Sequence, residues 1–347
     1  MTATTIEWTE HVWNPIVGCS LVSPGCTNCY AMRMAARIEA MDVSERNMPK
    51  PPTHYTGTTK RVKGKAVWTG KVALAPEHIF TAPLHWEKPR RIFINSMGDL
   101  FHEAVPDEWI LRVLDVIRRT SYDGGSNCGT IRGEHTYQLL TKRAARMASF
   151  MPRLRFDGRD DRGLYLSDEG KRPVVLKNLW LGVSAERQQE WNERCEHLGA
   201  TPATIRYVSV EPMLGPIDCG NAFDPPPDGS PYQPIDWVIC GGESGPGARP
   251  MHPEWGRSLR NQCHAAGVPF FFKQWGEWTP HKVMPGGDLG ADLRAGLVRI
   301  VHPSGRDDVE ILRESGGARQ TVLRAGKKAA GRLLDGKEHN EMPKVQS

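Results

Sequence analysis

The stretch "LWLGVSAERQQEWNERCEHLGATPATIRYVSVE" (residues 179–211) decides the expected fold of this chain. Its two ends, 179–184 and 205–211, are short apolar runs that are nearly continuous rather than alternating. That pattern is typical of parallel strands buried on both faces. The segment between them has a helical pattern and closes on Gly199, a residue type expected just past a helix. A strand, a helix and a second strand in this order predict a parallel βα unit.

Further apolar runs repeat this pattern along the chain. They lie at residues 12–18, 91–97, 136–142, 236–242 and 269–275. The run at 12–18 is the weakest, because Pro15 interrupts it. Helical patterns separate most of the runs, at 30–41, 106–120 and 253–267. The sequence therefore predicts an α/β fold, a parallel βα barrel that is partial or near-complete, with about six or seven strands.

The chain of 347 residues is long enough for one large α/β domain of roughly 250 residues plus an extension. We expect residues 1–278 to form the barrel, with an insertion at about 42–75 that includes the basic run "KRVKGK" (60–65). Residues 279–347 are then a C-terminal extension packed on the barrel.

Several local expectations accompany this division. Residues 153–173 read as a charged loop and 218–234 as a Pro-rich loop. In the extension, 297–301 and 308–312 are expected to pair as a hairpin, followed by a short helix at 326–336. In the helix at 30–41, the pattern places an apolar stripe on one face, formed by Tyr30, Met34, Ile38 and Met41.

The composition bounds the function. No apolar run approaches the roughly 20 residues that span a bilayer, and the N-terminus lacks the basic region of a secretory signal. We therefore expect a cytoplasmic protein without a membrane partner, whose thiols stay reduced and serve as ligands rather than disulfides. The net charge of +5 is mildly basic, which permits an anionic partner such as nucleic acid.

Three of the eight cysteines cluster in "GCSLVSPGCTNCYA" (18–31), as Cys19, Cys26 and Cys29. Pro24 and Gly25 occupy the positions that a type II turn prefers, so this turn would bring the first thiol back to the other two. Cys26 and Cys29 have the two-residue spacing that is common at metals. Cys29 also lies at the start of a predicted helix, where unpaired N–H groups stabilise a thiolate.

Three thiolates leave one coordination position open, and two kinds of metal site remain possible on spacing alone. A structural zinc ion would need a fourth protein ligand, for which His11 or Cys240 are candidates. A cuboidal iron–sulfur cluster could instead keep one iron free for a small molecule.

Polar residues follow the predicted strands at the point where each strand ends. In a parallel βα barrel these ends open onto one face, which carries the active site, so we expect acids, bases and thiols to converge there. The alternative is that the chain simply turns polar on leaving each strand. The residues are Cys19, Asn95 to Asp99, Lys142, Arg143, Ser184 to Glu186, Glu211, Glu243, Ser244, Lys273 and Gln274.

Long stretches of the chain resemble a known family. They include "IEWTEHVWNPIVGCSLVSPGCTNCYAMRMA" (6–35), "RIFINSMGDLFHEAVPDEWI" (91–110) and "WVICGGESGPGARPMHPEW" (237–255). On these stretches the chain is identified as a member of an uncharacterised three-cysteine-motif family, associated with phages and prophages. Three cysteines after a first strand, ahead of a parallel barrel, also resemble the radical S-adenosylmethionine superfamily. The spacing here, with six residues between the first two cysteines, is wider than the three that are usual in that superfamily, and Asn28 stands where an aromatic residue is usual.

The resemblance implies a 4Fe–4S cluster held by Cys19, Cys26 and Cys29, with S-adenosylmethionine bound at the open iron. It also implies a one-electron donor of the flavodoxin or ferredoxin kind as a partner, and hydrogen abstraction from a substrate by a 5′-deoxyadenosyl radical. The residues that the resemblance offers for binding S-adenosylmethionine are Tyr30, Ser96, Gly98, Asp99, Ser184 and Glu186.

The remaining strand-end residues are candidates for the substrate: Lys142, Arg143, Glu211, Glu243, Lys273 and Gln274. Modification or repair of nucleic acid is the leading expectation, with the basic run at 60–65 as a guide for a phosphate backbone. As a solvated loop face, that run needs no function. Radical modification of a peptide or small metabolite is one alternative. A zinc-stapled nucleic-acid-binding protein without catalysis is the other.

Overall fold

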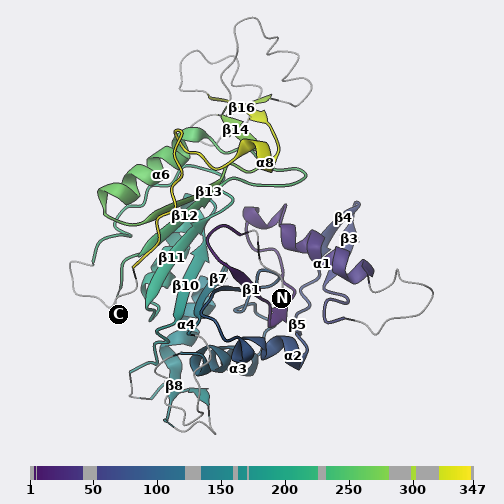
Figure 1. Cartoon of the computed structure of the whole chain (residues 1–347), viewed down its shortest axis with the longest axis vertical. Helices are drawn as coiled ribbons and strands as arrows, with labels where there is room; N and C mark the ends of the chain where they lie inside the picture. Colours follow the sequence, from purple (N-terminus) through teal and green to yellow (C-terminus); the bar gives the residue numbers. More distant parts are fainter. Residues whose placement is uncertain are drawn as a thin grey trace, which may run out of the picture.

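The computed structural model describes residues 4, 6–41, 53–121, 134–158, 163–169, 172–225, 232–280, 298–301 and 320–344. Its centre is one parallel sheet of seven strands that follow one another in chain order and curl into a half-barrel (Figure 1). The strands are β1 (His11–Trp13), β6 (Arg91–Ile94), β7 (Thr136–Thr141), β10 (Leu179–Ser184), β11 (Ile205–Val210), β12 (Trp237–Gly241) and β13 (Phe270–Gln274). Each of the seven apolar runs therefore supplies one strand of this sheet, and the predicted partial barrel is confirmed.

The predicted helices are present between these strands. They are α1 (Tyr30–Met41), α3 (Asp107–Arg119), α5 (Gln188–Gly199) and α6 (Pro253–Ala265), joined by α2 (Glu77–Phe80), α4 (Ala144–Phe150) and the 3-10 turns η2 (Ala82–His85) and η3 (Met151–Arg153). The helical pattern in this part of the sequence spans residues 184–199, whereas α5 begins at Gln188. Ser184 still belongs to the strand, and the N–H of Ala185 donates to Ser209 on the neighbouring strand, so the chain turns only after them.

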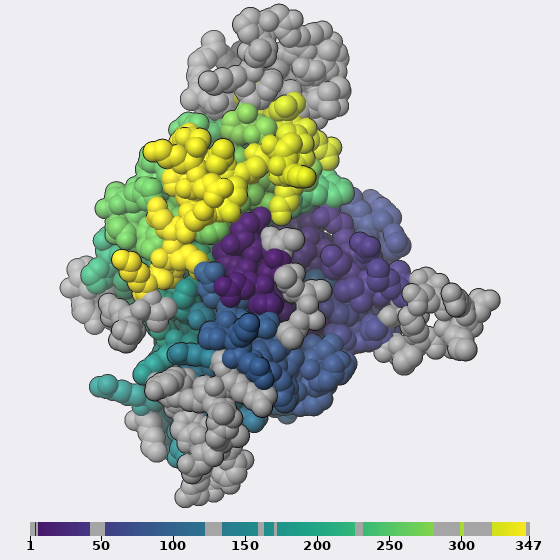
Figure 2. All heavy atoms as spheres, viewed as in Figure 1, coloured from purple at the N-terminus to yellow at the C-terminus, as the bar shows by residue number. Residues whose placement is uncertain are grey.

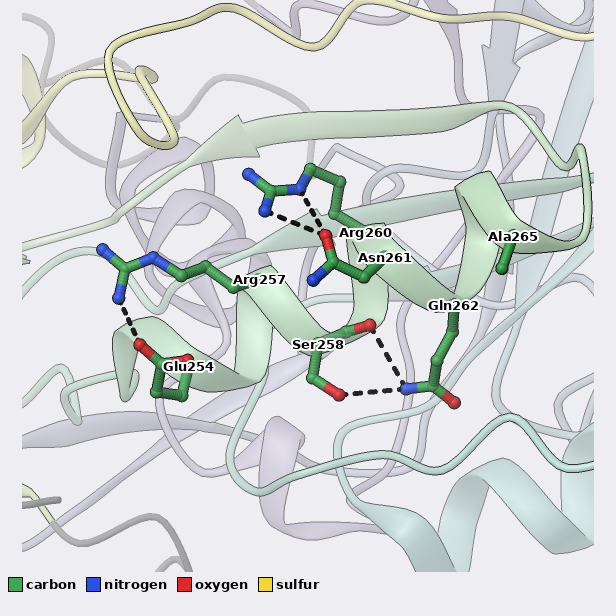
Figure 3. Close-up of a pocket in the computed structure, with 7 residues that line it drawn as sticks. All are labelled: Glu254, Arg257, Ser258, Arg260, Asn261, Gln262 and Ala265. Atoms are coloured by element: carbon green, nitrogen blue, oxygen red, sulfur yellow. Dashed lines mark hydrogen bonds and ion pairs between the residues drawn. The ribbon is translucent and has the colours of Figure 1, made fainter.

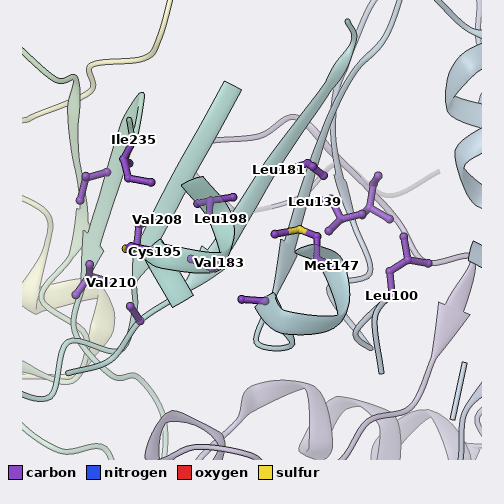
Figure 4. Packing of buried hydrophobic residues seen from close by; sticks show 14 of the residues in the cluster. Leu100, Leu139, Met147, Leu181, Val183, Cys195, Leu198, Val208, Val210 and Ile235 are labelled. Atoms are coloured by element: carbon purple, nitrogen blue, oxygen red, sulfur yellow. The ribbon is translucent and has the colours of Figure 1, made fainter. Parts of the chain in front are cut away.

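The two faces of the sheet carry different side chains. On the outer face, strand residues such as Leu139, Leu181 and Val183 pack against Met147 of α4 and Leu198 of α5 (Figure 4). The inner face is filled by a separate cluster, mostly aromatic: Trp8, Phe93, Trp180, Ile205, Tyr207, Trp237, Ile239 and Phe271. Because side chains alternate along a strand, Ile92 and Ile94 lie in the outer cluster and Phe93 lies in the inner one.

The open side of the half-barrel is covered by both ends of the chain. Figure 2 shows C-terminal residues (yellow) lying against the N-terminal segment (purple). Trp8 and Met342 pack in the same inner cluster, and the side chains of Lys327 and Glu7 approach to 3.9 Å. The tail also bridges the last strand, where Phe271 pairs with Asn340 and the N–H of Phe272 donates to the carbonyl of His339.

Residues 53–75 of the predicted insertion hold a hairpin, β3 (Thr59–Val62) and β4 (Lys65–Trp68), and a short strand, β5 (Ala73–Leu74), which pairs with β2 (Ile16–Val17). The hairpin contacts α1, and the predicted apolar face of that helix is wrong in part. Of the predicted stripe, Ile38 packs against the cluster on the hairpin side, whereas Tyr30, Met34 and Met41 are exposed. The buried positions on this side are instead Ala31, Met32 and Ala35.

The prediction of a loop at 153–173 was wrong in part. This segment contains an antiparallel pair, β8 (Leu154–Phe156) and β9 (Leu164–Leu166), whose Leu154 and Leu164 are buried in the outer core. The many charged residues of this segment suggested a loop, although Leu154 and Leu164 give each short strand one buried apolar residue. The Pro-rich loop at 218–234 has turns and no strand or helix in its described residues, 218–225 and 232–234.

The C-terminal region forms a small sheet of β14 (Trp278–Pro280), β16 (Gln320–Arg324) and β15 (Val298–Val301). The strand β15 pairs with β16. Residues 308–312, the predicted hairpin partner of β15, lie outside the described residues. The predicted helix at 326–336 is limited to α8 (Lys327–Ala330), because Gly331 follows with a φ of 69° and a ψ of −160° that end the helix. No helix in the described part of the chain is both long enough and apolar enough to cross a bilayer.

Gly182 lies on the inner face of β10, and a Cβ there would come within 2.4 Å of the Tyr207 ring. We predict that Gly182→Ala lowers the free energy of unfolding by about 1–3 kcal/mol, because the buried ring must move. Gly256→Ala is the matched control, since its nearest neighbour lies 3.7 Å away and the residue is inside α6. The control should be neutral or stabilising by up to about 1 kcal/mol. Urea unfolding of both variants measures the difference, and equal stabilities would contradict the prediction.

Candidate metal centre at the strand ends

The three clustered cysteines lie on a segment that crosses the carboxyl ends of the strands. The segment starts where Gly18 forms a parallel bridge with Gly98, beyond the end of β6. Cys19 follows this bridge, Cys26 ends the 3-10 turn η1 (Pro24–Cys26), and Cys29 directly precedes α1. All three are free thiols. We call residues 19–29 the cysteine loop.

The turn within the cysteine loop is not the predicted type II turn. The N–H of Cys26 donates to the carbonyl of Ser23 at 2.9 Å, but the three residues Pro24–Cys26 form a 3-10 turn and Gly25 has no positive φ. Gly25 is required for another reason. A Cβ at this position would lie 2.2 Å from Oε1 of Glu186, so the backbone of the loop rests directly on that carboxylate.

Glu186 is fully buried and connects the loop to the barrel. Its Oε1 accepts from Ser23 Oγ at 3.0 Å and from the ammonium group of Lys142, and its Oε2 accepts from Arg194 Nη1 at 3.3 Å. Burial alone would raise the pKa of Glu186, but the two cations outweigh it and hold the pKa below its usual value. The carboxylate therefore remains charged beneath the loop.

Arg143 makes the second connection, at the Cys19 end of the loop. Its Nη1 lies 3.3 Å from Cys19 Sγ and 3.2 Å from Asp99 Oδ2, and its Nη2 donates to Ser20 Oγ at 2.7 Å. The side chain is almost fully buried. Asp99 also accepts from Thr141 Oγ1 at 2.6 Å, so both of its oxygens are occupied by neighbours within the protein.

A third connection holds the Cys29 end. Asn28 donates from Nδ2 to Glu243 Oε2 at 3.0 Å and to the carbonyl of Gly247 at 2.9 Å. Glu243 in turn is held by Arg249, which also donates to the carbonyl of Pro24 at 3.0 Å. The loop is thus tied to the strand ends after β7, β10 and β12.

The other predicted site residues lie around this frame. Tyr30 donates from its hydroxyl to the carbonyl of Ser96 at 3.0 Å, and Lys273 and Gln274 both donate to Glu211, at 2.9 and 3.2 Å. The carbonyl of Ser184 accepts from Arg194. Gly98 allows the close approach of the segment at 16–18, since its Cβ would come within 3.0 Å of the Ile16 carbonyl oxygen.

The structure therefore brings the thiols and most of the strand-end polar residues to one edge of the sheet, many as ion pairs with one another. Contributors that sequence reasoning missed include Ser20, Ser23, Arg194 and Arg249. Ser20 and Ser23 lie inside the quoted cysteine stretch, and Arg249 lies in the stretch at 237–255, so position next to the motif was the available signal. Arg194 lies inside α5 and carried no signal.

The protein environment acts on the thiols in two directions. Burial raises the pKa of Cys19 to about 12, and the nearby Asp99 adds to this while Arg143 opposes it. Burial also raises the pKa of Cys29, although the N–H groups of Ala31 and Met32 at the start of α1 lower it. The expected stabilisation by the helix end is present but outweighed by burial. Binding of a metal would therefore release protons from these thiols.

The spacing of the sulfurs bears on which metal group fits. Around one tetrahedral zinc ion with Zn–S bonds of about 2.3 Å, the sulfurs lie about 3.8 Å apart. In the described residues, Cys19, Cys26 and Cys29 do not form a group whose ligand atoms all lie within 4.8 Å. A cluster is larger than one ion and needs thiolates farther apart, and soft thiolates suit iron–sulfur clusters. The three residues fit such a cluster in number and in the chemistry of their thiols.

The fold and this edge define a class of protein, an α/β half-barrel with a three-thiol loop at the carboxyl ends of its parallel strands. The model of a family described as "Protein of unknown function (DUF5131)" matches residues 3–343, and the chain belongs to that family. Comparisons with curated proteins and with solved structures gave no match.

We predict that Gly25→Ala weakens metal binding by the cysteine loop about 10–100-fold, the usual cost of losing support around a metal site. The added methyl group cannot fit against Glu186, so the loop must shift. Cobalt(II) titration, followed at the near-ultraviolet absorption of cobalt–thiolate bonds, reports this site alone. Gly215→Ala is the control, because its nearest neighbour lies 3.8 Å away. Equal affinities in the two variants would show that the loop does not depend on this contact.

Proposed function

We propose that this protein is a radical S-adenosylmethionine enzyme. The observation that carries the proposal is the placement of three free thiols at the carboxyl ends of a parallel half-barrel, on a loop tied to three strand ends. In parallel barrels this face carries the active site. The resemblance of the sequence to the superfamily supports the same assignment.

In this proposal Cys19, Cys26 and Cys29 hold a 4Fe–4S cluster. When bound, the cluster and S-adenosylmethionine together supply a 5′-deoxyadenosyl radical that abstracts hydrogen from a substrate. Arg143 lies at hydrogen-bond distance from Cys19 Sγ, and its charge and N–H groups stabilise that sulfur as a thiolate. Lys142 and Glu186 hold the centre of the loop in place.

The residues proposed to bind S-adenosylmethionine differ in what they can offer. Tyr30 and Ser96 lie together beside the cysteine loop, and Tyr30 is exposed. Asp99, Ser184 and Glu186 are buried and bonded within the protein, so in this proposal they support the cysteine loop rather than contact the cofactor. Glu211, with Lys273 and Gln274, is partly exposed and offers a charged pair to a polar ligand.

The proposed substrate class is nucleic acid. The helix α1 begins directly after Cys29 and exposes Arg33 and Arg37, and the hairpin that packs on α1 exposes basic side chains at Lys60, Arg61, Lys63 and Lys65. A phosphate backbone is bound by such groups without regard to sequence. A basic surface attached to the same helix as the thiols would place a nucleic acid beside the proposed radical chemistry.

The cluster can be tested directly. We predict roughly four irons and four sulfides per chain after anaerobic purification, and release of 5′-deoxyadenosine when dithionite and S-adenosylmethionine are added. Cys26→Ala should lose both, whereas Cys195→Ala, a buried cysteine of the outer core, should keep both.

Two results would overturn this prediction. Stoichiometric zinc without sulfide would exclude the cluster and favour a zinc-stapled protein. A loaded cluster that releases no 5′-deoxyadenosine would leave the cluster standing and remove the radical step.

The nucleic-acid proposal makes a separate prediction. Replacing both Lys63 and Lys65 by Ala should weaken binding to a labelled single-stranded oligonucleotide at low salt. It should also reduce the slope of log affinity against log salt by about 0.7 for each phosphate that the protein no longer neutralises. Lys337→Ala, an exposed lysine of the C-terminal tail, is the control. An unchanged slope in the double variant would remove the hairpin from the binding surface.

A further inference from the structure

A second group of ligand-bearing side chains lies at the opposite end of the sheet from the cysteine loop. His264 lies in the last turn of α6, and His339 and Glu341 belong to the C-terminal tail. The tail reaches this place along the start of the last strands. The N–H of Phe270 donates to Glu341 Oε2 at 2.9 Å, and Trp237 Nε1 donates to the carbonyl of Glu341 at 2.8 Å.

The three side chains have the spacing of a metal site. One ligand atom from each lies within 4.8 Å of the other two, and no other trio of His, Cys, Asp or Glu in the described residues does so. His264 Nε2 and Glu341 Oε1 are 3.1 Å apart. Two ligands at about 2.0–2.1 Å from one tetrahedral ion lie about 3.3 Å apart, so this pair is already at that separation.

His339 supplies an independent observation. Its ring bonds to the backbone of Leu334, while its Nε2 is buried and has no hydrogen-bond partner among the described residues. The bond to Leu334 is therefore made by Nδ1. A metal-binding histidine usually donates one ring nitrogen to a backbone carbonyl and keeps the other for the ion. A buried nitrogen left without a partner costs free energy, which a bound ion would recover.

The surroundings favour a bound cation. Glu341 contributes a negative charge, and its second oxygen is held by Phe270. The guanidinium group of Arg260, on the same helix as His264, is bonded to Asp335 at 2.7 Å.

The site is open on the α6 side. His264 and Glu341 are each nearly half exposed, which leaves room for water as a further ligand. A shallow pocket runs along the same helix, lined by Arg257, Arg260 and Ala265 among others (Figure 3). Arg257 and Arg260 both bond to Asp335, which ties the start of the tail to α6.

We propose that His264, His339 and Glu341 bind a zinc ion, with water as the fourth ligand, and that this ion fastens the C-terminal tail to α6 and to the edge of β13. Two imidazoles and one carboxylate suit zinc, and none of the three belongs to the cysteine loop. The site lies at the amino ends of the strands, the end of a parallel barrel that serves stability rather than catalysis. The water ligand is an open position that a closed structural zinc site lacks. The role assigned to this ion is to hold the tail, and this role rests on the place of the site in the fold rather than on its ligand number.

Cobalt(II) titration of the full-length chain separates this site from the thiols, because nitrogen and oxygen ligands give no thiolate absorption. We expect the unchanged protein to bind one more cobalt ion than either His339→Ala or Glu341→Gln, and the difference spectrum to lack the thiolate band. His85→Ala, an exposed histidine of η2, is the control and should keep the ion. Zinc should raise the melting temperature of the unchanged protein and of the control, and should raise it less in the two variants.

Glu341→Gln is the variant expected to keep the fold, since its amide oxygen can still accept from the Phe270 N–H. A loss of cobalt in this variant would therefore not result from misfolding. Equal cobalt stoichiometry in all four proteins, or a thiolate band in the difference spectrum, would overturn the proposal and leave His264 and Glu341 as a simple ion pair.

Discussion

The contact between the Glu186 carboxylate and the backbone of Gly25 is the constraint on which this site depends. The strand β10 is the central strand of the sheet, so Glu186 leaves the barrel at its middle. A buried carboxylate is costly unless it is paired, and Lys142 and Arg194 pair it from the two neighbouring elements. Because the loop backbone contacts this carboxylate, position 25 has no room for a side chain, and the distance between the loop and the sheet is fixed. This contact therefore also fixes where the thiols on either side of Gly25 lie.

The charges at this edge are arranged as supports for the loop rather than as a free lining. Glu186, Asp99 and Glu243 each face an arginine or lysine, and each pair also touches the cysteine loop. The acidic and basic groups that could bind a polar substrate are thus already paired with one another, and these pairs fix the backbone of the loop. What remains for a ligand is the exposed surface above, where Tyr30, the pair of Glu211 and Lys273, and the basic residues of α1 lie.

Much of the fold could be predicted because it rests on periodicity. Each of the seven strands is a continuous apolar run, and a run buried on both faces is readable without its partners. The errors fall where tertiary contacts decide. The β3–β4 hairpin packs on a face of α1 that periodicity did not favour, and the Pro24–Gly25 pair lies in a 3-10 turn above Glu186 rather than in a type II turn. The thiols were predictable from spacing. Arg194 was not, because its role depends on a helix lying against a distant loop.

The two ends of the sheet share one structural problem. At each end, a segment outside the barrel is attached to the strand ends by polar contacts. At the carboxyl ends, ion pairs fix a loop whose thiols remain free of disulfides. At the amino ends, the tail is fixed by backbone bonds and ends beside a histidine nitrogen with no partner. A half-barrel has an open side where a closed barrel would have further strands, and here the N-terminal segment and the tail cover it. Fastening that tail is therefore part of closing the fold, since its Met342 packs against the aromatic inner cluster.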